Sequence, residues 1–370
     1  MGGLPAFESD TEWLRGEGTA CDVVMSSRVR LARNLAGIPF APKMSDDDRE
    51  EVLERSRAQI LAGGVHPKVM WIDLRQIGAL ERSVLVERQL ISGQLASGKA
   101  FGHSSGGRGA GEKRARGVAV GLPDERLSIM VNEEDHLRIQ VIRSGLGLSA
   151  ALEEVVRADD ALEAGLDYAF GARFGYLTCC PTNVGTGARF SVMMHLPGLR
   201  LTGEIEKVKR AADDMGLAVR GFHGEGSETT GDLYQLSNQT TLGKSERVLL
   251  SEIEREIVPR VADYERHARR VLTERRREVL EDQVHRAIGT GLHARLLATG
   301  EAMAVLSAVR LGAVLGVVAG IDQTAVNALM LAVQPAHLQR VLGRELNQQE
   351  RKGERATLVR ERLALALGGG

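Results

Sequence analysis

Apolar and polar residues alternate along the middle of the chain in a way that is typical of half-buried β-strands. In Leu137–Val141 the apolar residues occupy every second position, which places Arg138 on the opposite face. The segment 189–196 repeats this pattern, and one of its faces carries Arg189, Ser191, Met193 and His195. We therefore predict a largely strand-forming region from about residue 118 to residue 240, with one face buried and the other available for chemistry.

The remaining periodicity is helical, and it divides the chain in two. Helices are predicted at about 46–62, 78–96, 148–168, 203–215 and 244–258. After Pro259 the sequence becomes rich in Arg, Leu and Ala, with no convincing strand before the C-terminal glycines. This change predicts a domain boundary near residues 250–260.

Composition narrows the class of protein. The 370 residues are 43% hydrophobic and 26% charged, with a formal net charge of −1, which is typical of globular domains rather than disordered chains. Residues 251–370 carry 18 basic and 15 acidic side chains, an excess of only three positive charges. The Arg-rich helices therefore do not form a basic domain, and we predict no nucleic-acid partner.

The cysteines and the apolar segments indicate the compartment. Three cysteines, two of them adjacent (Cys21, Cys179 and Cys180), form a poor disulfide framework and favour a reducing environment. The first residues show no signal-peptide pattern, and the longest apolar stretch, Leu311–Ile321, is interrupted by glycine and too short to cross a bilayer. We expect a cytoplasmic protein with no membrane partner.

Familiar nucleotide and metal motifs do not account for the sequence. Gly93–Ala100 comes close to a Walker A loop, but Ala100 lacks the hydroxyl that binds Mg²⁺, and the preceding residues 85–91 are predicted as helix rather than strand. No spacing of cysteines and histidines suggests zinc. We therefore predict no metal site built by the protein itself.

Arginines instead punctuate four separate segments of the chain. Arg28 and Arg30 lie in the first segment, and the others contain Arg138, Arg189 and Arg220. Arginine presents a rigid fork that binds phosphate oxygens in pairs, and phosphoryl transfer depends chiefly on positioning and charge neutralisation. The five side chains therefore fit a triphosphate cage. Each one taken alone is more often a surface ion-pair partner, and their spacing does not decide between the two interpretations.

These segments resemble the phosphagen (ATP:guanido) kinases. The motifs S-S-R-V-R, N-E-E-D-H-L-R, L-T-C-C-P-T-N-V-G-T-G-A-R and R-G-F-H-G-E-G-S-E, followed by Y-Q-L-S-N-Q-T-T-L-G, occur in that family's order over about residues 22–250. The chain is most similar to the McsB-type protein arginine kinases, because it lacks the helical N-terminal domain of kinases of free arginine or creatine. It also continues into a helical C-terminal domain, as those protein kinases do.

The resemblance implies an α+β fold with two domains. Residues 1–254 are expected to form a phosphagen-kinase-like catalytic domain, with a mainly antiparallel sheet flanked by helices. Residues 255–370 are expected to form an all-α C-terminal domain for dimerisation and phosphoarginine binding.

The resemblance also implies roles for residues at matching positions. Glu134 and Glu225 match the two carboxylates that grip the substrate guanidinium, and Cys180 matches the reactive thiol beside it. Met193 matches a contact to the adenine. The full nucleotide-binding set implied in this way is Ser26, Ser27, Arg28, Val29, Arg30, His103, Arg138, Arg189, Phe190, Ser191, Val192, Met193, Arg220, Gly221, Phe222, His223 and Gly224.

The chemistry of a guanidinium explains why these residue types are needed. It is protonated at neutral pH and is not a nucleophile, so a base must take a proton as its nitrogen attacks phosphorus. Two carboxylates can hold the planar fork while one accepts that proton, and Glu134 and Glu225 both remain candidates. A thiolate at Cys180 would add negative charge beside the nitrogen; a packing cysteine at a strand end is the alternative. The implied cofactors are ATP and Mg²⁺, with the ion held mainly by nucleotide and water.

The helical domain contains a second candidate site. The McsB-type kinases carry a phosphoarginine-binding pattern, R-D-x-x-R-A, and residues 351–356 read R-K-G-E-R-A. Both arginines are kept, but Lys352 replaces the acid and cannot accept hydrogen bonds from a guanidino group, although it attracts phosphate. Arg351 and Arg355 are therefore either a phosphoarginine site or a solvated helix end.

Together these features predict a protein arginine kinase that acts as a homodimer on proteins with exposed arginine. The resemblance further implies marking of substrates for a Clp chaperone-protease and regulation of a stress-response repressor. Whether an activator protein is needed stays open. Two alternatives stay open: a kinase of a small free guanidino metabolite such as arginine, and a catalytically silent phosphoarginine-binding adaptor.

Overall fold

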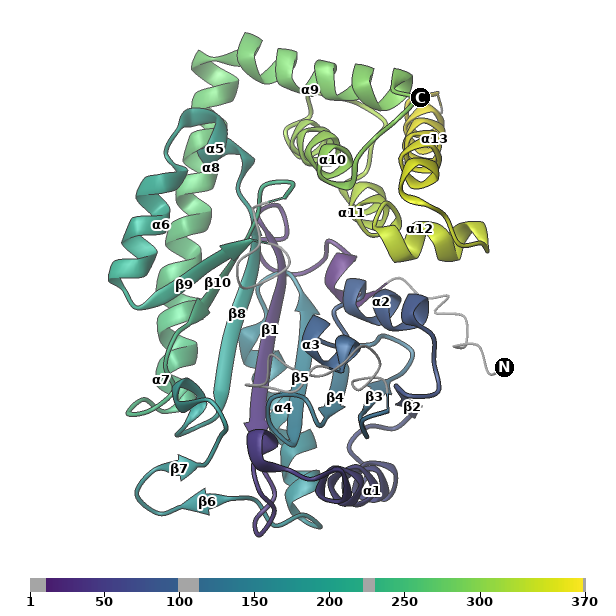
Figure 1. The fold of residues 1–370 in the computed structure, drawn as a ribbon. Coiled ribbons are helices and arrows are strands. Elements are labelled where there is room, and N and C mark those ends of the chain that lie inside the picture. Colours follow the sequence, from purple (N-terminus) through teal and green to yellow (C-terminus); the bar gives the residue numbers. More distant parts are fainter. Residues whose placement is uncertain (1–10, 99–112, 222–229, 369–370) are drawn as a thin grey trace.

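An antiparallel eight-stranded sheet forms the centre of the N-terminal part of the molecule (Figure 1). The computed structural model describes residues 11–98, 113–221 and 230–368. The strand order is β2-β3-β4-β5-β1-β8-β10-β9, and a separate hairpin pairs β6 with β7. The strands are β1 (Val24–Arg33), β2 (Val69–Asp73), β3 (Gly117–Gly121), β4 (Leu127–Val131), β5 (Leu137–Ser144), β6 (Phe170–Gly171), β7 (Gly175–Tyr176), β8 (Ala188–His195), β9 (Leu217–Gly221) and β10 (Leu233–Asn238).

Helices flank this sheet and make up the C-terminal part. The first group consists of α1 (Asp46–Ala62), α2 (Ala79–Glu87), α3 (Gly93–Ser97), α4 (Leu148–Glu163), α5 (Pro197–Thr202), α6 (Ile205–Asp214) and α7 (Glu246–Leu250). The second consists of α8 (Val258–Arg275), α9 (Arg277–His293), α10 (Thr299–Val314), α11 (Gln323–Ala332), α12 (Pro335–Leu342) and α13 (Gln348–Gly368). The expected α+β fold with an antiparallel sheet and a helical C-terminal part is confirmed. None of the helices in the described ranges is both long and apolar enough to span a membrane.

The clearest periodicities in the sequence correspond to observed elements. The strands predicted at 137–141 and 189–196 are β5 and β8, and the helix predicted at 46–62 is α1. Helix α1 begins with a capping box, because the Ser45 side chain accepts from the Asp48 N–H while the Asp48 carboxylate accepts from the Ser45 N–H.

The prediction of one helix over 78–96 is wrong. Helix α2 ends at Glu87 and α3 begins at Gly93. Between them Gln89 adopts a left-handed backbone conformation (φ 64°), which a helix cannot contain, and Ser92 caps α3 by accepting from the Leu95 N–H. The segment predicted as a helix over 244–258 is α7 followed by a π-helical segment, Ser251–Ile257, that leads into α8. Strands β1 and β2 lie before the predicted strand region.

The two faces of the sheet are packed differently. One face of the central strands packs with α1, α4, α6 and α8 in the largest hydrophobic cluster, which includes Ile139, Val141 and Phe190. The opposite face of β2–β4 packs on α2 and α3 in a smaller cluster. A third cluster joins the C-terminal helices to one end of the central strands through Met25 and Ile142. The central strands between the second and third clusters carry polar side chains.

Helix α8 contributes to two of these clusters. Its residues Val258, Val261 and Ala268 pack in the sheet cluster, whereas Leu272 packs with the C-terminal helices. The boundary predicted near 250–260 therefore falls at the start of a helix that both cores share.

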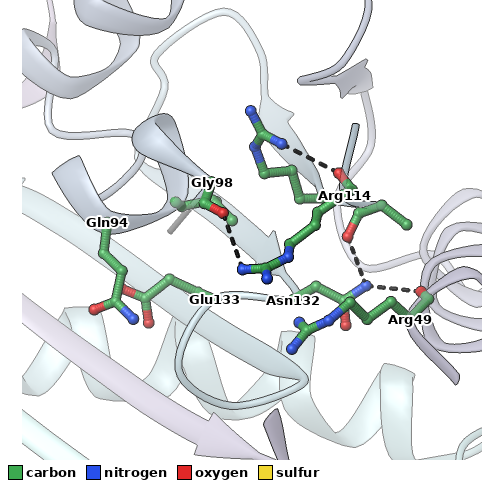
Figure 2. A pocket seen from close by; sticks show the side chains of 9 residues that line it. Arg49, Gln94, Gly98, Arg114, Asn132 and Glu133 are labelled. Carbon is green, nitrogen blue, oxygen red and sulfur yellow. Dashed lines mark hydrogen bonds between the residues drawn. The ribbon is translucent and has the colours of Figure 1, made fainter. Parts of the chain in front are cut away.

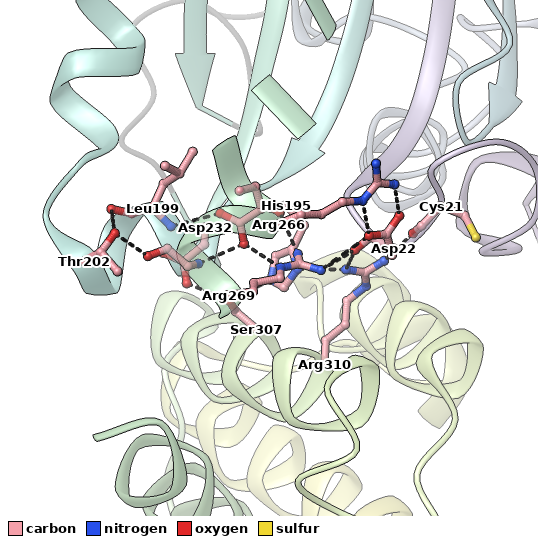
Figure 3. A network of polar contacts seen from close by, with 12 residues as sticks. Cys21, Asp22, His195, Leu199, Thr202, Asp232, Arg266, Arg269, Ser307 and Arg310 are labelled. Carbon is pink, nitrogen blue, oxygen red and sulfur yellow. Dashed lines mark hydrogen bonds and ion pairs between the residues drawn. The ribbon is translucent and has the colours of Figure 1, made fainter. Parts of the chain in front are cut away.

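A buried polar network connects the C-terminal helices to the sheet (Figure 3). Arg310 on α10 is 0% exposed and donates to the carbonyl oxygens of Cys21 and Asp22 and to Asn327 Oδ1. Its Nη1 also lies 2.8 Å from His195 Nδ1. Burial lowers the pKa of Arg310 to about 9 and holds the pKa of His195 well below its ordinary value. His195 on β8 therefore serves this junction rather than the polar face of the sheet.

Replacing Arg310 should destabilise the protein strongly. Arg310→Leu would leave the Asn327 side chain and two backbone carbonyl oxygens without their donor in a buried environment, at a cost of about 3 kcal/mol or more. Urea unfolding of the variant and the wild type measures this difference. Arg277→Leu is the matched control, since Arg277 pairs with Glu281 at the surface and should be nearly neutral. Equal losses in the two variants would contradict the assignment.

Candidate active site

Strand register brings the predicted arginines onto one face of the central sheet. Arg30 on β1 pairs with Arg189 on β8, and Arg220 on β9 pairs with Gln235 on β10. Residues directly opposite each other in neighbouring strands share a face. Arg138 lies on the adjacent strand β5, on the face opposite its buried neighbours. Four segments that are distant in sequence therefore present guanidinium groups to the same space.

That space is a cavity of about 540 Å³. It is lined by all five predicted arginines, by Glu134 and by Cys180. The rest of the wall is formed by residues to which the sequence assigned no role, namely Val86, Glu87, Gln89, Ile91, Ser92, Gly93, Gln94, Glu133, Thr182, Asn183 and Gln235. In the part of the chain that the structure describes, no group of three or more His, Cys, Asp or Glu side chains is arranged to hold a metal ion.

Arg28 is oriented by three neutral side chains. Its Nε donates to Ser191 Oγ at 3.3 Å, its Nη1 to Gln89 Oε1 at 3.1 Å and its Nη2 to Gln235 Oε1 at 2.8 Å. Burial and the charges of two neighbouring arginines lower the pKa of Arg28 to about 10, so it stays cationic at neutral pH. Because none of the three partners is charged, Arg28 keeps its charge available for an anion.

Arg30 has a buried hydrogen-bond donor without a partner among the described residues. Burial and the nearby charges of Arg28, Arg138 and Arg189 hold its pKa well below the ordinary value. Arg30 Nε is buried and has no hydrogen-bond partner among the described residues. A buried donor without a partner costs about 1–3 kcal/mol, and a phosphate oxygen would satisfy it. The cavity therefore fits a ligand with several negative charges, such as a nucleoside triphosphate.

Two adjacent carboxylates face these arginines. Glu133, which is 6% exposed, accepts from Ser92 Oγ at 2.6 Å and from Arg138 Nη1 at 2.8 Å. Arg138 Nη2 donates to Glu134 Oε2 at 2.9 Å, so this arginine is held between the two acids. Burial raises the pKa of Glu134 in spite of that contact. A carboxylate with a raised pKa at a cavity wall is suited to accept a proton.

Asp135 ties the carboxylate loop to the cysteine loop. It is 0% exposed, and its Oδ1 accepts from Asn34 Nδ2 and from the Cys179 N–H, both at 2.7 Å. Burial raises the pKa of Asp135. Because Asp135 is next to Glu134 and Cys179 is next to Cys180, these bonds fix the two cavity residues relative to each other.

The two adjacent cysteines have different environments. Cys180 lines the cavity, and its Sγ lies 3.1 Å from Thr182 Oγ1. Pro181 begins a 3₁₀ turn, Pro181–Asn183, that carries two further lining residues. Cys179 is not among the lining residues, and burial raises the pKa of its thiol to about 11. Cys180 is therefore the cysteine positioned for chemistry.

A second, much smaller hollow of about 10 Å³ lies behind the carboxylates and borders Glu133 (Figure 2). Asn132 donates there from Nδ2 to the carbonyl oxygens of Arg49 and Ala115, and it adopts a left-handed backbone (φ 61°). The hollow is about the size of one water molecule and does not hold a nucleotide. Its hydrogen bonds instead hold the turn that presents Glu133 and Glu134.

Apart from the five arginines, the predicted nucleotide-binding residues differ in their positions. Ser26 on β1 and Gly221 at the end of β9 do not line the cavity. Ser191 contacts Arg28 at the cavity. Five residues have side chains that are at most 4% exposed and do not line the cavity: Ser27, Val29, Phe190, Val192 and Met193. Four of the predicted nucleotide-binding residues lie outside the described ranges, namely His103, Phe222, His223 and Gly224, and so does Glu225, which was predicted to hold the substrate guanidinium. Met193 packs in the cluster formed with the C-terminal helices.

The arginines of the helical-domain motif lie on α13, away from the cavity. Arg355 is 2% exposed, and it donates to the carbonyl oxygens of Val333, Leu297 and Arg351. Arg351 donates to the carbonyl oxygen of Leu346. The alternative of a solvated helix end is therefore wrong for Arg355, which braces the backbone of the helical domain.

Comparisons with known proteins agree with this geometry. A family model described as ATP:guanido phosphotransferase, C-terminal catalytic domain, matches residues 54–268, and one described as protein-arginine kinase McsB C-terminal domain matches residues 277–367. The chain is 46% identical to a protein-arginine kinase of Symbiobacterium thermophilum, over 96% of this chain and 97% of the relative. It is 45% identical to a protein-arginine kinase of Moorella thermoacetica, over 97% and 99% of the two chains.

Solved structures show the same fold. Lombricine kinase matches with a TM-score of 0.56 and 25% identity, over 68% of each chain. The duplicated taurocyamine kinase of Schistosoma mansoni matches with a TM-score of 0.57 and 23% identity, over 78% of this chain and 42% of that one.

The histidine of the carboxylate loop should make stability dependent on pH. His136 accepts from the Leu35 N–H at Nδ1, its Nε2 lies 3.0 Å from the Pro39 carbonyl oxygen, and burial lowers its pKa from 6.5 to about 4. As the pH falls, His136 is protonated in the unfolded state before it is protonated in the folded state. The contribution of neutral His136 to the free energy of unfolding is therefore complete above pH 6.5 and decreases by about 3 kcal/mol as the pH falls toward 4. Urea unfolding at several pH values measures this slope. In His136→Gln, which has no titrating ring, the slope over that interval should be much smaller; equal slopes would contradict the assignment.

Proposed function

This chain belongs to the protein-arginine kinases of the ATP:guanido phosphotransferase family, and from that membership and the cavity we propose that it transfers the γ-phosphate of ATP to arginine side chains of proteins. The observation that carries the proposal is the meeting of five arginines, Glu134 and Cys180 in one cavity. The arginines suit the phosphates, and the carboxylate and thiol suit a guanidinium substrate.

The residues of the cavity would have different roles in the reaction. Arg28 and Arg30 would bind phosphate oxygens, since the first is oriented without being neutralised and the second has a donor to satisfy. Arg138, held between Glu133 and Glu134, would lie where the phosphoryl group meets the acceptor. ATP bound with Mg²⁺ supplies the phosphoryl group, and the ion is expected to be held mainly by nucleotide and water.

Of the two candidates for the base, Glu134 is the one within the described residues, and it lines the cavity. Its raised pKa makes it a better proton acceptor than an ordinary carboxylate. The planar guanidinium would be held by Glu134 and by Glu225, which remains a prediction from its motif. Cys180 would place a sulfur with negative charge beside the attacking nitrogen.

The choice of acceptor and the biological setting extend the same proposal. We propose proteins with exposed arginine as substrates, in line with the names of the relatives at 39–46% identity. The cytoplasmic location remains a prediction from the cysteines and the apolar segments. The family resemblance predicts a homodimer, delivery of marked proteins to a Clp chaperone-protease, regulation of a stress-response repressor and phosphoarginine binding at Arg351. The need for an activator protein stays open.

The direct test compares two acceptors. Purified protein is incubated with Mg·ATP and either free arginine or an unfolded arginine-containing protein, and acid-labile phosphate is measured. A P–N bond hydrolyses in acid, whereas a Ser or Thr phosphate ester survives, so label on the protein alone is the expected result. Label on free arginine would favour the metabolite kinase, and label on neither acceptor would favour the silent adaptor or a missing activator protein.

Removing the proposed base should abolish transfer without abolishing nucleotide binding. Glu134→Gln keeps the size of the side chain but accepts no proton, so turnover should fall about 10²-fold or more. The dissociation constant of Mg·ADP, measured by calorimetry, should change little. Glu252→Gln is the control, because Glu252 only pairs with Lys244 at the surface. Near-normal turnover in Glu134→Gln would remove this residue from the role of base.

A further inference from the structure

Three consecutive residues at the C-terminal end of helix α2, Glu87, Arg88 and Gln89, are anchored to three different parts of the molecule. Glu87 contacts helix α12 of the helical domain. Arg88 forms a buried ion pair with Glu125, with the two side chains 6% and 2% exposed. Gln89 contacts Arg28 in the cavity. Both Glu87 and Gln89 line the cavity, although neither belongs to the motifs that identify the site.

Helix α12 obtains its N-terminal cap from Glu87. The residue at its own N-cap, Gln334, makes no side-chain capping bond, and Pro335 has no N–H. The next two N–H groups, of Ala336 and His337, donate to Glu87 Oε1 and Oε2, both at 2.8 Å. His337 Nδ1 also lies 2.7 Å from Glu87 Oε2. A carboxylate at a helix N-terminus satisfies unpaired donors and opposes the positive end of the helix dipole. The cap is therefore a specific bond between the domains.

Gln89 holds Arg28 from the other end of this segment. Its Oε1 accepts from Arg28 Nη1 at 3.1 Å, and its backbone carbonyl oxygen accepts from Gln140 Nε2 at 2.6 Å. Its left-handed backbone turns the side chain out of the helix path and toward the sheet. Gln89 is one of only three side-chain partners of Arg28 among the described residues.

The chain between the Glu87 contact to α12 and the Gln89 contact to Arg28 is short. Glu87 and Gln89 are separated by one residue, so their Cα atoms are at most about 7 Å apart. The intervening Arg88 is fixed by its buried ion pair, which is costly to break. A shift of α12 that moved Glu87 would turn this short segment about Arg88 as a fixed point, and would so displace Gln89 at its other end.

We propose that Glu87 and Gln89 are positioning residues for Arg28. Through these two residues, the position of helix α12 sets the affinity of the cavity for nucleotide phosphates. The inference rests on the proposed function in that it takes Arg28 to bind the nucleotide. It assigns the helical domain a direct part in building the nucleotide site.

A double-variant cycle tests this arrangement. Glu87→Gln removes the charge and one acceptor from the cap, and Gln89→Ala removes the contact to Arg28. Each should raise the dissociation constant of Mg·ADP and the KM for ATP by about 5-fold, since Ser191 and Gln235 still hold Arg28. Because Glu87 acts through Gln89, the double variant should bind no more weakly than Gln89→Ala alone. The proposal would be overturned if the fold-increases in the dissociation constant from the two single variants multiplied in the double variant. It would also be overturned if Glu87→Gln bound Mg·ADP like the wild type.

Gln323→Ala provides the matched control. Gln323 on α11 donates to the Gly16 carbonyl oxygen, so the variant removes another bond between the helical domain and the N-terminal part, far along the chain from Glu87. Its nucleotide affinity should equal that of the wild type. If Gln323→Ala weakened binding as much as Glu87→Gln, general loosening of the interface would explain the effect and the proposal would be overturned.

If Glu87→Gln does not fold, Gln89→Ala alone decides, because wild-type affinity in that variant also overturns the proposal. An inactive wild type would instead contradict the proposed function.

Discussion

Like charges that are brought together in a partly buried cavity repel one another, and the catalytic part of this protein holds five arginines in one such cavity. Strand pairing forces them together, because Arg30 and Arg189 are directly opposite in adjacent strands. The repulsion and burial are visible in the lowered pKa values of Arg28 and Arg30. Arg138 is held between two carboxylates, whereas the three described partners of Arg28 are neutral. The positive charge that Arg28 and Arg30 present makes the cavity a receptor for a polyanion.

A rigid support is needed to maintain this arrangement, and the opposite face of the sheet supplies it. Ile139, Val141 and Phe190 are fully buried there, and they alternate with the residues of the cavity along the same strands. A one-residue slip of β1, β5 or β8 would move an arginine into the hydrophobic core, which is prohibitively costly. The hydrophobic core and the charged cavity therefore specify the same register.

The sequence pattern predicted the parts of the site that depend on local order. Alternation in β5 and β8 placed Arg138 and Arg189 on polar faces, and the family motifs identified Glu134 and Cys180. Glu133 was missed, because only the fold brings Ser92 and Arg138 to its side chain.

Features that depend on distant contacts could not be predicted from the sequence. The break between α2 and α3 depends on a left-handed Gln89, a residue type with no special preference for that conformation. Arg355 lies in a charged motif typical of a solvated helix, yet it is buried and donates to the carbonyl oxygens of Val333 and Leu297, which belong to other segments.

The sharing of helix α8 between two cores has a practical consequence for dissecting the protein. A fragment that ended at residue 254 would lack Val258, Val261 and Ala268, and would leave their apolar neighbours in the sheet cluster uncovered. A fragment that began there would carry the same apolar stripe into solvent. Excised halves of this kind are prone to aggregate, so the separate contributions of the two domains are better studied by point substitution in the intact chain than by truncation.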